Sequence, residues 1–334
     1  MSQASGRRLR ARRALVRRTV LQIQPIWSQL DLDNVAGSWA VLSPRVVELV
    51  TEAQRQAASG ADEYVAQAAA ELGVASRPAG PINPTRLAGV ASDGRPLDTL
   101  MLASPLRTLR ALSVTGNGDE ARAAGLTKLV QLTATQLYDS GRGADSVAIT
   151  TNQAVAGWRR KLRAPSCDRC IVLADRFYPW SSGFRRHPMC DCVHEPALRG
   201  DQPGEDLSPQ RTFDRMPKAE QDRVFGEAPA QAIRDGADLR QVVNARRGMK
   251  TVTAYGRKVS ATTEGTTTTG FAGRRLAAAG EELQRQRSLT FTTLRGARRT
   301  RERVRIPRLM PEQIYADAVD REDAIRLLRR FGYI

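Results

Sequence analysis

The soft metal-binding side chains of this 334-residue chain are confined to one short window. All four cysteines and both histidines lie between Cys167 and His194, in the stretch CDRCIVLADRFYPWSSGFRRHPMCDCVH. Cys167 and Cys170 have the spacing at which two thiolates of one tight turn face a single tetrahedral ion. The apolar residues of the window are too few to bury a core unaided, so the sequence predicts a small segment that a bound metal ion folds. We expect this segment to fix the connection between the N-terminal and C-terminal halves of the chain.

The second half of the window, HPMCDC, follows Cys170 after a spacer of sixteen residues, a separation common in zinc ribbons and knuckles. Cys190 and Cys192 alternate by two, so in an extended segment both project to the same side. His187 precedes Cys190 by three positions, a distance that a turn can close. We predict a structural zinc site whose ligands come from five residues, with the set of four left open: Cys167, Cys170, His187, Cys190 and Cys192. His194 is the weakest candidate because the other five already exceed four.

Other interpretations of the window are two disulfides, unligated thiols or a redox role. The N-terminus lacks the apolar core of a secretory signal, which indicates a reducing cytoplasm and favours metal over disulfides. An Arg-rich transit peptide is a minor alternative. A catalytic zinc would need an open position and a placed base, and nothing singles out one of the acids nearby. These acids are Asp168, Asp175, Asp191 and Glu195.

Positive charge is concentrated at both ends of the chain. The formal net charge is +17, and no stretch has the roughly 20 apolar residues of a membrane span. Two arginine-rich segments predict extended arms that bind the phosphate backbone of nucleic acid without sequence readout. The predicted DNA contacts are Arg7, Arg8, Arg10, Arg12, Arg13, Arg17 and Arg18 at one end, and Arg295, Arg298, Arg299, Arg301, Arg303 and Arg305 at the other.

The remaining chain has mostly helical periodicity, which predicts a mainly α fold. Helical patterns cover residues 39–72, with a break at Gly60, and residues 97–164; Asp119 is the expected N-cap after a turn at Asn117 and Gly118. A β-hairpin or ordered loop is expected near residues 253–270, and a final amphipathic end is opened by Pro311 and capped by Asp320. The segments expected are a basic arm at 1–30, a helical domain at 31–164, a zinc knuckle at 165–200, a helical and loop region at 201–284, and a basic arm with terminal helices at 285–334.

The combination of CDRC and FRRHPMCDC resembles the signature of the MuF-like minor head proteins, the head morphogenesis family of tailed phages. The C-terminal half is similar to minor capsid proteins of phages that infect actinobacteria, through FGEAPAQAIRDGADLRQVVNARRGM, TTEGTTTTG and RLMPEQIYADAVDREDAIRLLRRFGYI. This resemblance implies an interior virion component made in the host cytoplasm. Its implied partners are the portal protein, a scaffold or major capsid protein, and packaged double-stranded DNA bound without sequence readout. The lack of a long apolar stretch predicts no membrane partner.

Three functions are set against one another. The first is a non-enzymatic head component with a structural zinc site and DNA-facing arms. The second is a capsid maturation protease acting on scaffold or capsid protein, which the label of some relatives suggests. No G-x-S-x-G nucleophile elbow occurs, and both histidines lie in the metal window, so no catalytic residue is assigned. The third is a zinc-containing regulator that reads nucleic-acid sequence.

Overall fold

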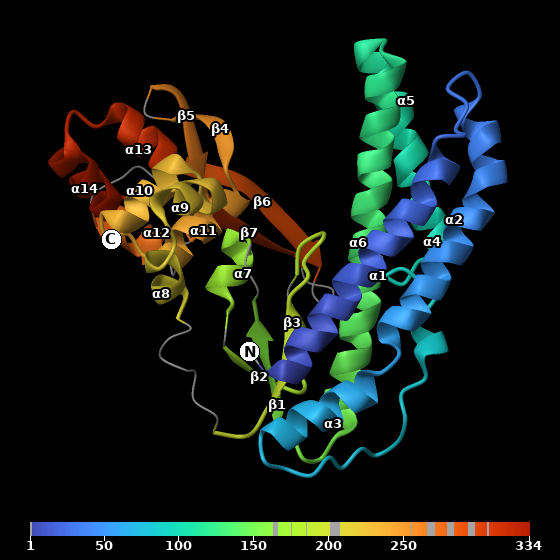
Figure 1. Cartoon of the computed structure of the whole chain (residues 1–334). Helices are drawn as coiled ribbons and strands as arrows, with labels where there is room; N and C mark the ends of the chain where they lie inside the picture. The colour runs from blue at the N-terminus through green and yellow to red at the C-terminus, as the bar shows by residue number, and fades with distance from the viewer. Residues whose placement is uncertain are drawn as a thin grey trace. The chain divides into compact units, whose positions relative to one another are not determined.

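The protein is described by a computed structural model that covers residues 2–162, 166–174, 176–184, 186–200, 208–254, 256–265, 271–278, 284–292, 298–305 and 307–334 (Figure 1). It divides into two compact units. Unit 1 comprises Met1–Ala164 and Ala174–Glu205, and unit 2 comprises Pro165–Leu173 and Asp206–Ile334. The prediction of a mainly α-helical chain is confirmed. Within the described ranges, no helix combines the length and the apolar character needed to cross a membrane.

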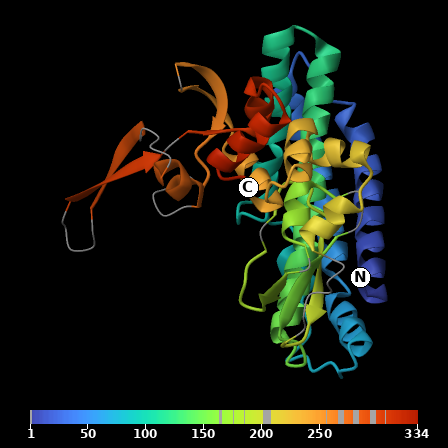
Figure 2. The ribbon, with the colours of Figure 1, turned by 90° about the vertical axis from the view of Figure 1, so that its left-hand side faces the viewer.

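Unit 1 is a bundle of long helices with a small sheet. In Figures 1 and 2 its longest helices, coloured blue to green, run alongside one another. The elements are α1 (Gln3–Trp27), α2 (Val35–Ala58), α3 (Ala61–Glu71), the 3-10 helix η1 (Pro84–Leu87), α4 (Leu97–Met101), α5 (Ala103–Thr115), α6 (Gly118–Thr151), β1 (Gly157–Lys161), β2 (Phe177–Pro179) and β3 (Val193–Ala197).

The basic N-terminal segment is a helix of the bundle, which corrects the expectation of an extended arm at residues 1–30. Ser2 caps α1 by accepting a hydrogen bond from the backbone N–H of Ser5. Leu9, Ile23 and Trp27 recur on one face of α1 and are each 1% exposed. This apolar face packs α1 into the bundle, so its arginines are held on a rigid element.

Local signals place the helix ends largely as expected. The predicted break at Gly60 is confirmed, because Gly60 has a φ of 69° between α2 and α3, a conformation that glycine adopts without strain. The predicted turn before α6 is also confirmed, but its N-cap is Asn117 instead of Asp119. The Asn117 side chain accepts hydrogen bonds from the backbone N–H groups of Asp119 and Glu120, so the residue two positions earlier takes the capping role.

The core of the bundle depends on close approach of α6 to its neighbours. Trp27 and Trp39 meet edge to face with ring centroids 5.8 Å apart, and Leu129 of α6 is fully buried in the same cluster. Gly125 allows this approach: a methyl group there would overlap the Thr108 hydroxyl and lie 2.5 Å from Cζ2 of Trp27.

We therefore expect Gly125→Ala to destabilise unit 1 by about 1–3 kcal/mol through overpacking, despite the ~1 kcal/mol that alanine gains over glycine in a helix. Gly143→Ala on the same helix is the matched control, since its added methyl group would meet only Leu87, at 3.8 Å. The control is expected to be neutral or slightly stabilising in urea denaturation. Equal loss in both variants would contradict this account of the packing.

The small sheet of unit 1 has the order β2-β1-β3, with both pairs antiparallel. The helical periodicity read through residues 157–164 is therefore wrong for Gly157–Lys161, which form the central strand. Trp158 on this strand is 1% exposed and stacks on Tyr178 with ring centroids 4.3 Å apart. Strand β1 forms because β2 and β3, about 20 and 40 residues later in the chain, pair with it. No local sequence pattern predicts such pairing.

Unit 2 consists of short helices and antiparallel strands. Its elements are α7 (Asp168–Val172), α8 (Pro209–Asp214), α9 (Lys218–Phe225), α10 (Glu227–Arg234), α11 (Leu239–Arg247), β4 (Lys250–Ala254), β5 (Arg257–Thr262), α12 (Phe271–Ala278), β6 (Gln284–Thr292), β7 (Arg298–Arg305), β8 (Arg308–Leu309), α13 (Pro311–Asp317) and α14 (Arg321–Arg330). The predicted hairpin is confirmed as β4 and β5. Pro311 opens α13 and Asp320 caps α14, as expected.

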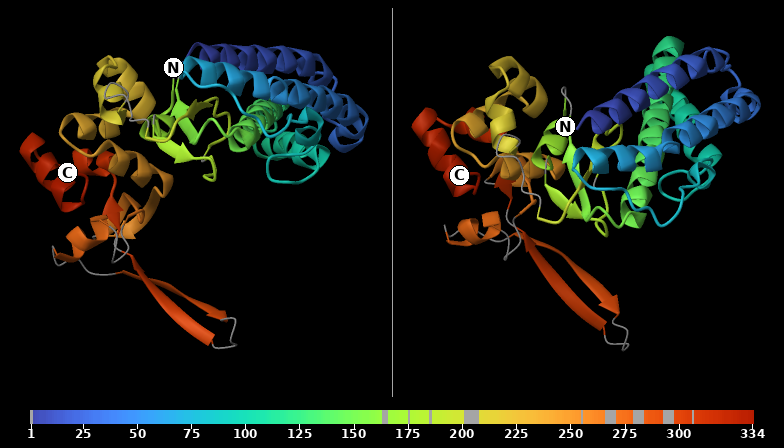
Figure 3. Two further views of the ribbon diagram at one scale, coloured as in Figure 1. Left: turned by 90° about the horizontal axis from the view of Figure 1, so that it is seen from below. Right: turned by 60° about the horizontal axis from the view of Figure 1, so that its bottom comes forward.

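The second basic segment is mainly a β-ribbon. Figure 3 shows β6 and β7 as a long antiparallel pair. Arg308, three positions after Arg305, lies in β8 and is 1% exposed. Its Nε donates to the Phe331 carbonyl at 2.6 Å, and one of its Nη atoms donates to the Gly332 carbonyl at 2.7 Å. Arg308 thus anchors the C-terminal segment instead of contributing surface charge.

Candidate metal centre

The five predicted zinc ligands come from two stretches of the window. Cys167 caps α7 and Cys170 lies within it, while His187, Cys190 and Cys192 lie in the connection between β2 and β3. Two groups have all their ligand atoms within 4.8 Å of one another: Cys167, Cys170 and His187, and Cys170, Cys190 and Cys192. Cys170 belongs to both groups. These cysteine and histidine side chains are close enough together to hold a metal ion.

Three of the four thiols are buried. Cys170, Cys190 and Cys192 are 4%, 1% and 3% exposed, and Cys167 is half-buried. None of the four cysteines takes part in a disulfide. Buried thiolates repel one another unless a cation lies between them, and a tetrahedral Zn²⁺ ion accepts four such ligands. The donor set therefore fits a soft divalent metal.

His187 has one ring nitrogen engaged by a neighbouring carbonyl oxygen. Its Nδ1 lies 2.8 Å from the carbonyl oxygen of Pro188, to which it can only donate. The proton is then on Nδ1, and Nε2 carries the lone pair that a metal requires. The same histidine belongs to the group formed with Cys167 and Cys170. Local geometry thus supports His187 beside the cysteines as a ligand.

Arg142 of α6 holds the turn that carries Cys190 and Cys192. One Nη donates to the Cys190 carbonyl oxygen and, at 3.4 Å, to that of Cys192. The other Nη is paired with Asp139, one turn earlier on the same helix. A further contact on this turn is a hydrogen bond of 3.7 Å from Arg160 to Sγ of Cys190. These contacts hold the backbone of the two predicted ligands and place the positive charge of Arg160 beside the sulfur atom of Cys190.

We expect Arg142→Met to weaken metal binding by about 10- to 100-fold, the usual cost of losing a residue that orients metal ligands. Arg122→Met is the matched control, because Arg122 is another α6 arginine that donates to backbone carbonyls, those of Ser28 and Leu30. Competition with a chromogenic zinc chelator measures both affinities. Equal affinities in the two variants would contradict a positioning role for Arg142.

The acidic residues of the window are mostly engaged in ion pairs. Asp168 pairs with Arg246 at 3.2 Å, Asp191 pairs with Arg13, and Glu195 pairs with Lys161 at 3.4 Å. Asp175 lies outside the described residues. Burial raises the pKa of Asp168, with the backbone N–H of Arg169 opposing the shift. The described carboxylates of the window are thus paired with cations.

The predicted DNA contacts of α1 fall into two sets. Arg7, Arg10, Arg17 and Arg18 are exposed. The prediction that Arg12 contacts DNA does not fit the structure. Arg12 is 4% exposed and pairs with the fully buried Asp145 at 2.5 Å. Arg8 also pairs with Asp145, at 3.1 Å, and Arg13 pairs with Asp191, so neither presents a free charge. Helical periodicity turns these three arginines inward, where they meet acids more than a hundred residues away in the sequence.

Five of the six predicted contacts of the second basic segment lie on β7. The backbones of Arg298, Arg299, Arg301, Arg303 and Arg305 belong to this strand. Arg295 lies outside the described residues.

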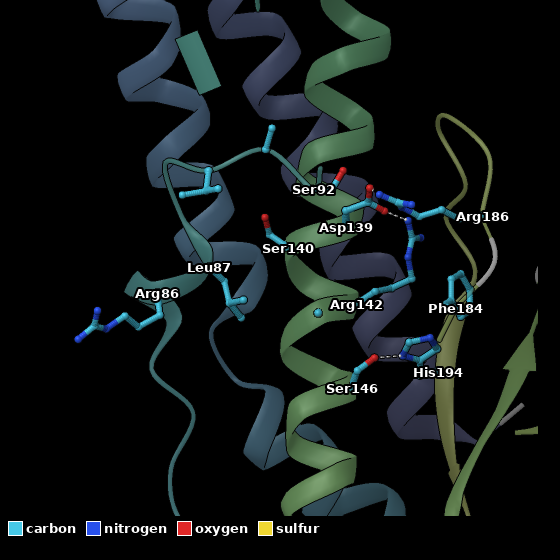
Figure 4. A pocket seen from close by; sticks show the side chains of 13 residues that line it. Arg86, Leu87, Ser92, Asp139, Ser140, Arg142, Ser146, Phe184, Arg186 and His194 are labelled. Carbon is cyan, nitrogen blue, oxygen red and sulfur yellow. Dashed lines mark hydrogen bonds and ion pairs between the residues drawn. The ribbon is translucent and has the colours of Figure 1, made fainter. Parts of the chain in front are cut away.

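His194 contacts α6, which the sequence does not predict (Figure 4). It belongs to neither metal group of the described residues. Its Nδ1 lies 2.9 Å from Oγ of Ser146 on α6, and its ring is 1% exposed beside Trp158. Burial, together with the charge of Arg142, lowers the pKa of His194 well below its ordinary value. No local sequence pattern predicts this contact, because Ser146 lies 48 positions earlier in the chain.

Comparison with known proteins identified no relative of this chain. The chain matches no family model, no curated protein and no solved structure.

Proposed function

We propose that this chain is a non-enzymatic minor head protein of a tailed phage, built around a structural zinc site. The observation that carries the proposal is the closeness of four cysteines and His187, all from one short window of the sequence, in two overlapping groups. That cluster is the same CDRC and HPMCDC signature that resembles MuF-like proteins. In this proposal the protein occupies the capsid interior after assembly in the host cytoplasm, where it contacts portal and scaffold or major capsid protein.

Zinc is the metal that this donor set favours. Thiolate and imidazole ligands select soft or borderline ions, and zinc needs four ligands with no redox chemistry. The site has enough cysteines to be completed by protein groups alone, which is typical of structural zinc and leaves no position for a reacting water. Zinc bound in this way contributes its binding energy directly to folding.

The DNA-facing role in this proposal rests on the exposed arginines of α1. Arg10 and Arg17 lie seven positions apart on this helix, so both occupy its solvent face. A net charge of +17 favours contact with packaged DNA. Binding of this kind releases counterions and ignores base sequence.

We expect Arg10→Gln with Arg17→Gln to reduce the slope of log affinity against log salt by about 2, one for each lost phosphate contact. The double variant Arg107→Gln with Arg110→Gln removes the same charge from exposed positions of α5 and is the control. Fluorescence anisotropy with two duplexes of unrelated sequence measures both. Sequence-selective binding would instead support the regulator hypothesis.

Mass spectrometry of procapsids and mature particles of the phage that encodes the chain tests its place in the virion. The proposal predicts the intact chain in procapsids. Its absence from both particles would overturn the proposal.

A capsid maturation protease is the second candidate, and the contact between Ser146 and His194 is the observation in its favour. A serine nucleophile needs a histidine base that a third group orients. Within the described part of the chain, Nε2 of His194 has no hydrogen-bond partner, so a triad is not formed. Incubation with scaffold or capsid subunits distinguishes the candidates, because protease activity requires specific cleavage that Ser146→Ala abolishes.

A further inference from the structure

Helix α5 carries a row of apolar side chains on its exposed side. Leu102, Leu106 and Leu109 follow one another at spacings of four and three, which places them on one face of a helix. Leu102 has helical dihedral angles at the junction of α4 and α5, and its carbonyl oxygen accepts from the backbone N–H of Leu106 at 3.2 Å. These leucines are 46%, 62% and 42% exposed in turn. We call the three leucines the α5 stripe.

The opposite side of α5 is the side that packs into unit 1. Ser104, Pro105 and Thr108 are buried, and α5 runs along α6 (Figure 1). The helix is thus already held in the bundle by one face while the stripe lies on another. A lone exposed leucine is ordinary on a protein surface, but a contiguous row of them indicates a contact surface for another molecule.

Two arginines border one side of the α5 stripe. Arg107 directly follows Leu106, and Arg110 follows Leu106 by four positions, one helical turn. Both arginines are exposed, and within the described part of the chain neither guanidinium group pairs with a carboxylate. The sequence of α5 contains no acidic residue. The stripe therefore has a cationic flank that its own helix does not neutralise.

The spacing of the α5 stripe fits an α-helix as the partner. Leucines at intervals of three and four form a ridge that packs into the groove of a second helix, and amphipathic helices dock through anchors of this spacing. The arginines select a helix with carboxylates along one flank of its apolar face, because complementary charges across an interface favour the correct partner. The net charge of +17 attracts the same acidic partner.

Two other occupants fit the α5 stripe less well. Packing α5 against α5 of a second copy offers the arginines no carboxylate from that helix, since α5 has no acidic residue. A helix that lies on a membrane commonly anchors itself with aromatic side chains at the interface. Helix α5 has no aromatic residue, which favours a protein partner over a lipid surface.

We propose that the α5 stripe binds an amphipathic α-helix of another protein, with carboxylates along one flank of its apolar face. The apolar face of that helix covers Leu102, Leu106 and Leu109, and its carboxylates pair with Arg107 and Arg110. This surface goes beyond the proposed head function, because it uses neither the predicted metal ligands nor the arginines of α1.

Fluorescence anisotropy of the full-length protein with a designed helical peptide tests the proposal. The peptide has about 18 residues, long enough to form a helix in water, with leucines on one face and glutamates along one flank. A second peptide has lysine in place of each glutamate. We expect the glutamate peptide to bind about tenfold or more tightly than the lysine peptide. Equal affinities would overturn the acidic flank of the partner, and no binding of either peptide would overturn the proposal.

Charge reversal separates the two arginines from the net charge of the chain. Arg107→Glu with Arg110→Glu is expected to remove the preference for the glutamate peptide, because the flank of the stripe becomes acidic. Arg10→Glu with Arg17→Glu makes the same change in net charge on α1 and is expected to keep the preference. A preference that survives in the α5 variant, or is lost equally in both, would overturn the contact with Arg107 and Arg110.

Leu106→Ser tests the apolar contact at the centre of the stripe. We expect it to weaken the glutamate peptide at least about tenfold, because the leucine of the partner loses the side chain that it covers. Leu21→Ser makes the same change at an exposed leucine of α1 and is expected to keep the wild-type affinity. Melting curves confirm that both variants are folded. Undiminished binding by folded Leu106→Ser would overturn the proposal.

Two further measurements address the other occupants. Sedimentation velocity is expected to give the same oligomeric state for the wild-type protein and Leu106→Ser. A wild-type dimer that Leu106→Ser dissociates would show a second copy on the stripe and overturn the proposal. Cosedimentation with vesicles of anionic phospholipid is expected to be unchanged by Leu106→Ser. Vesicle binding that this variant abolishes would show a lipid surface on the stripe and would equally overturn the proposal.

Discussion

Replacing Cys170 by serine is expected to abolish stoichiometric zinc binding and to lower the melting temperature of the chain. Cys170 has the largest expected effect of the five candidates because it alone belongs to both ligand groups. Structural zinc contributes an apparent ~10–16 kcal/mol to the folding of small zinc-finger peptides. Loss of one ligand is therefore expected to remove a sizeable part of the free energy that folds this segment. Elemental analysis of the purified variant and a thermal melt measure the two effects.

A chelator provides the internal control for the Cys170→Ser experiment. The melting temperature of the wild-type chain is expected to fall when the metal is removed. The variant, which has already lost its metal, is expected to melt at the same temperature with and without the chelator. A Cys170→Ser protein that retains one zinc ion and melts like the wild type would refute the assignment of Cys170 as a ligand.

Asp145→Asn is expected to destabilise unit 1 by about 3–5 kcal/mol, the usual cost of breaking a buried ion pair on one side. The Asp145 side chain is fully buried and accepts from Arg8 and Arg12. Burial lowers the pKa of Arg12 to about 10, with Asp145 opposing the shift. Arg12 therefore keeps its charge at neutral pH, and the variant leaves that charge unpaired in the interior.

Asp93→Asn is the matched control for Asp145→Asn. Asp93 pairs with Arg95 at 2.7 Å, but both side chains are about half exposed. An ion pair of this kind is worth at most about 1 kcal/mol. Urea denaturation of the two variants measures the difference, and similar losses would show that the Asp145 cluster does not stabilise the bundle.

The sequence allowed prediction of those elements whose signals are local. The break at Gly60, the hairpin of β4 and β5, and the starts of α13 and α14 each depend on a glycine, a proline or a capping side chain within a few positions. The candidate metal centre was also predictable, because a pair of cysteines three apart and a second group after a short spacer are local patterns.

The features that escaped prediction depend on contacts distant in the sequence. The inward charge of Arg12 makes sense only beside Asp145, which lies 133 positions later. The strand β1 is recognisable only from its partners β2 and β3. His194 looked like a spare zinc ligand, and only the packing of β3 against α6 shows that it faces Ser146. The arginines of residues 1–30 likewise predict a DNA-binding arm, whereas the fold shows that an apolar face of α1 packs this segment into the bundle.

Native mass spectrometry of the full-length chain, purified without chelators, tests the central claim most directly. The account predicts one zinc ion per chain, four reduced cysteines, and release of the ion on acidification. A metal-free mass, or a mass showing disulfides between the four cysteines, would contradict the structural zinc site on which the proposed function is built.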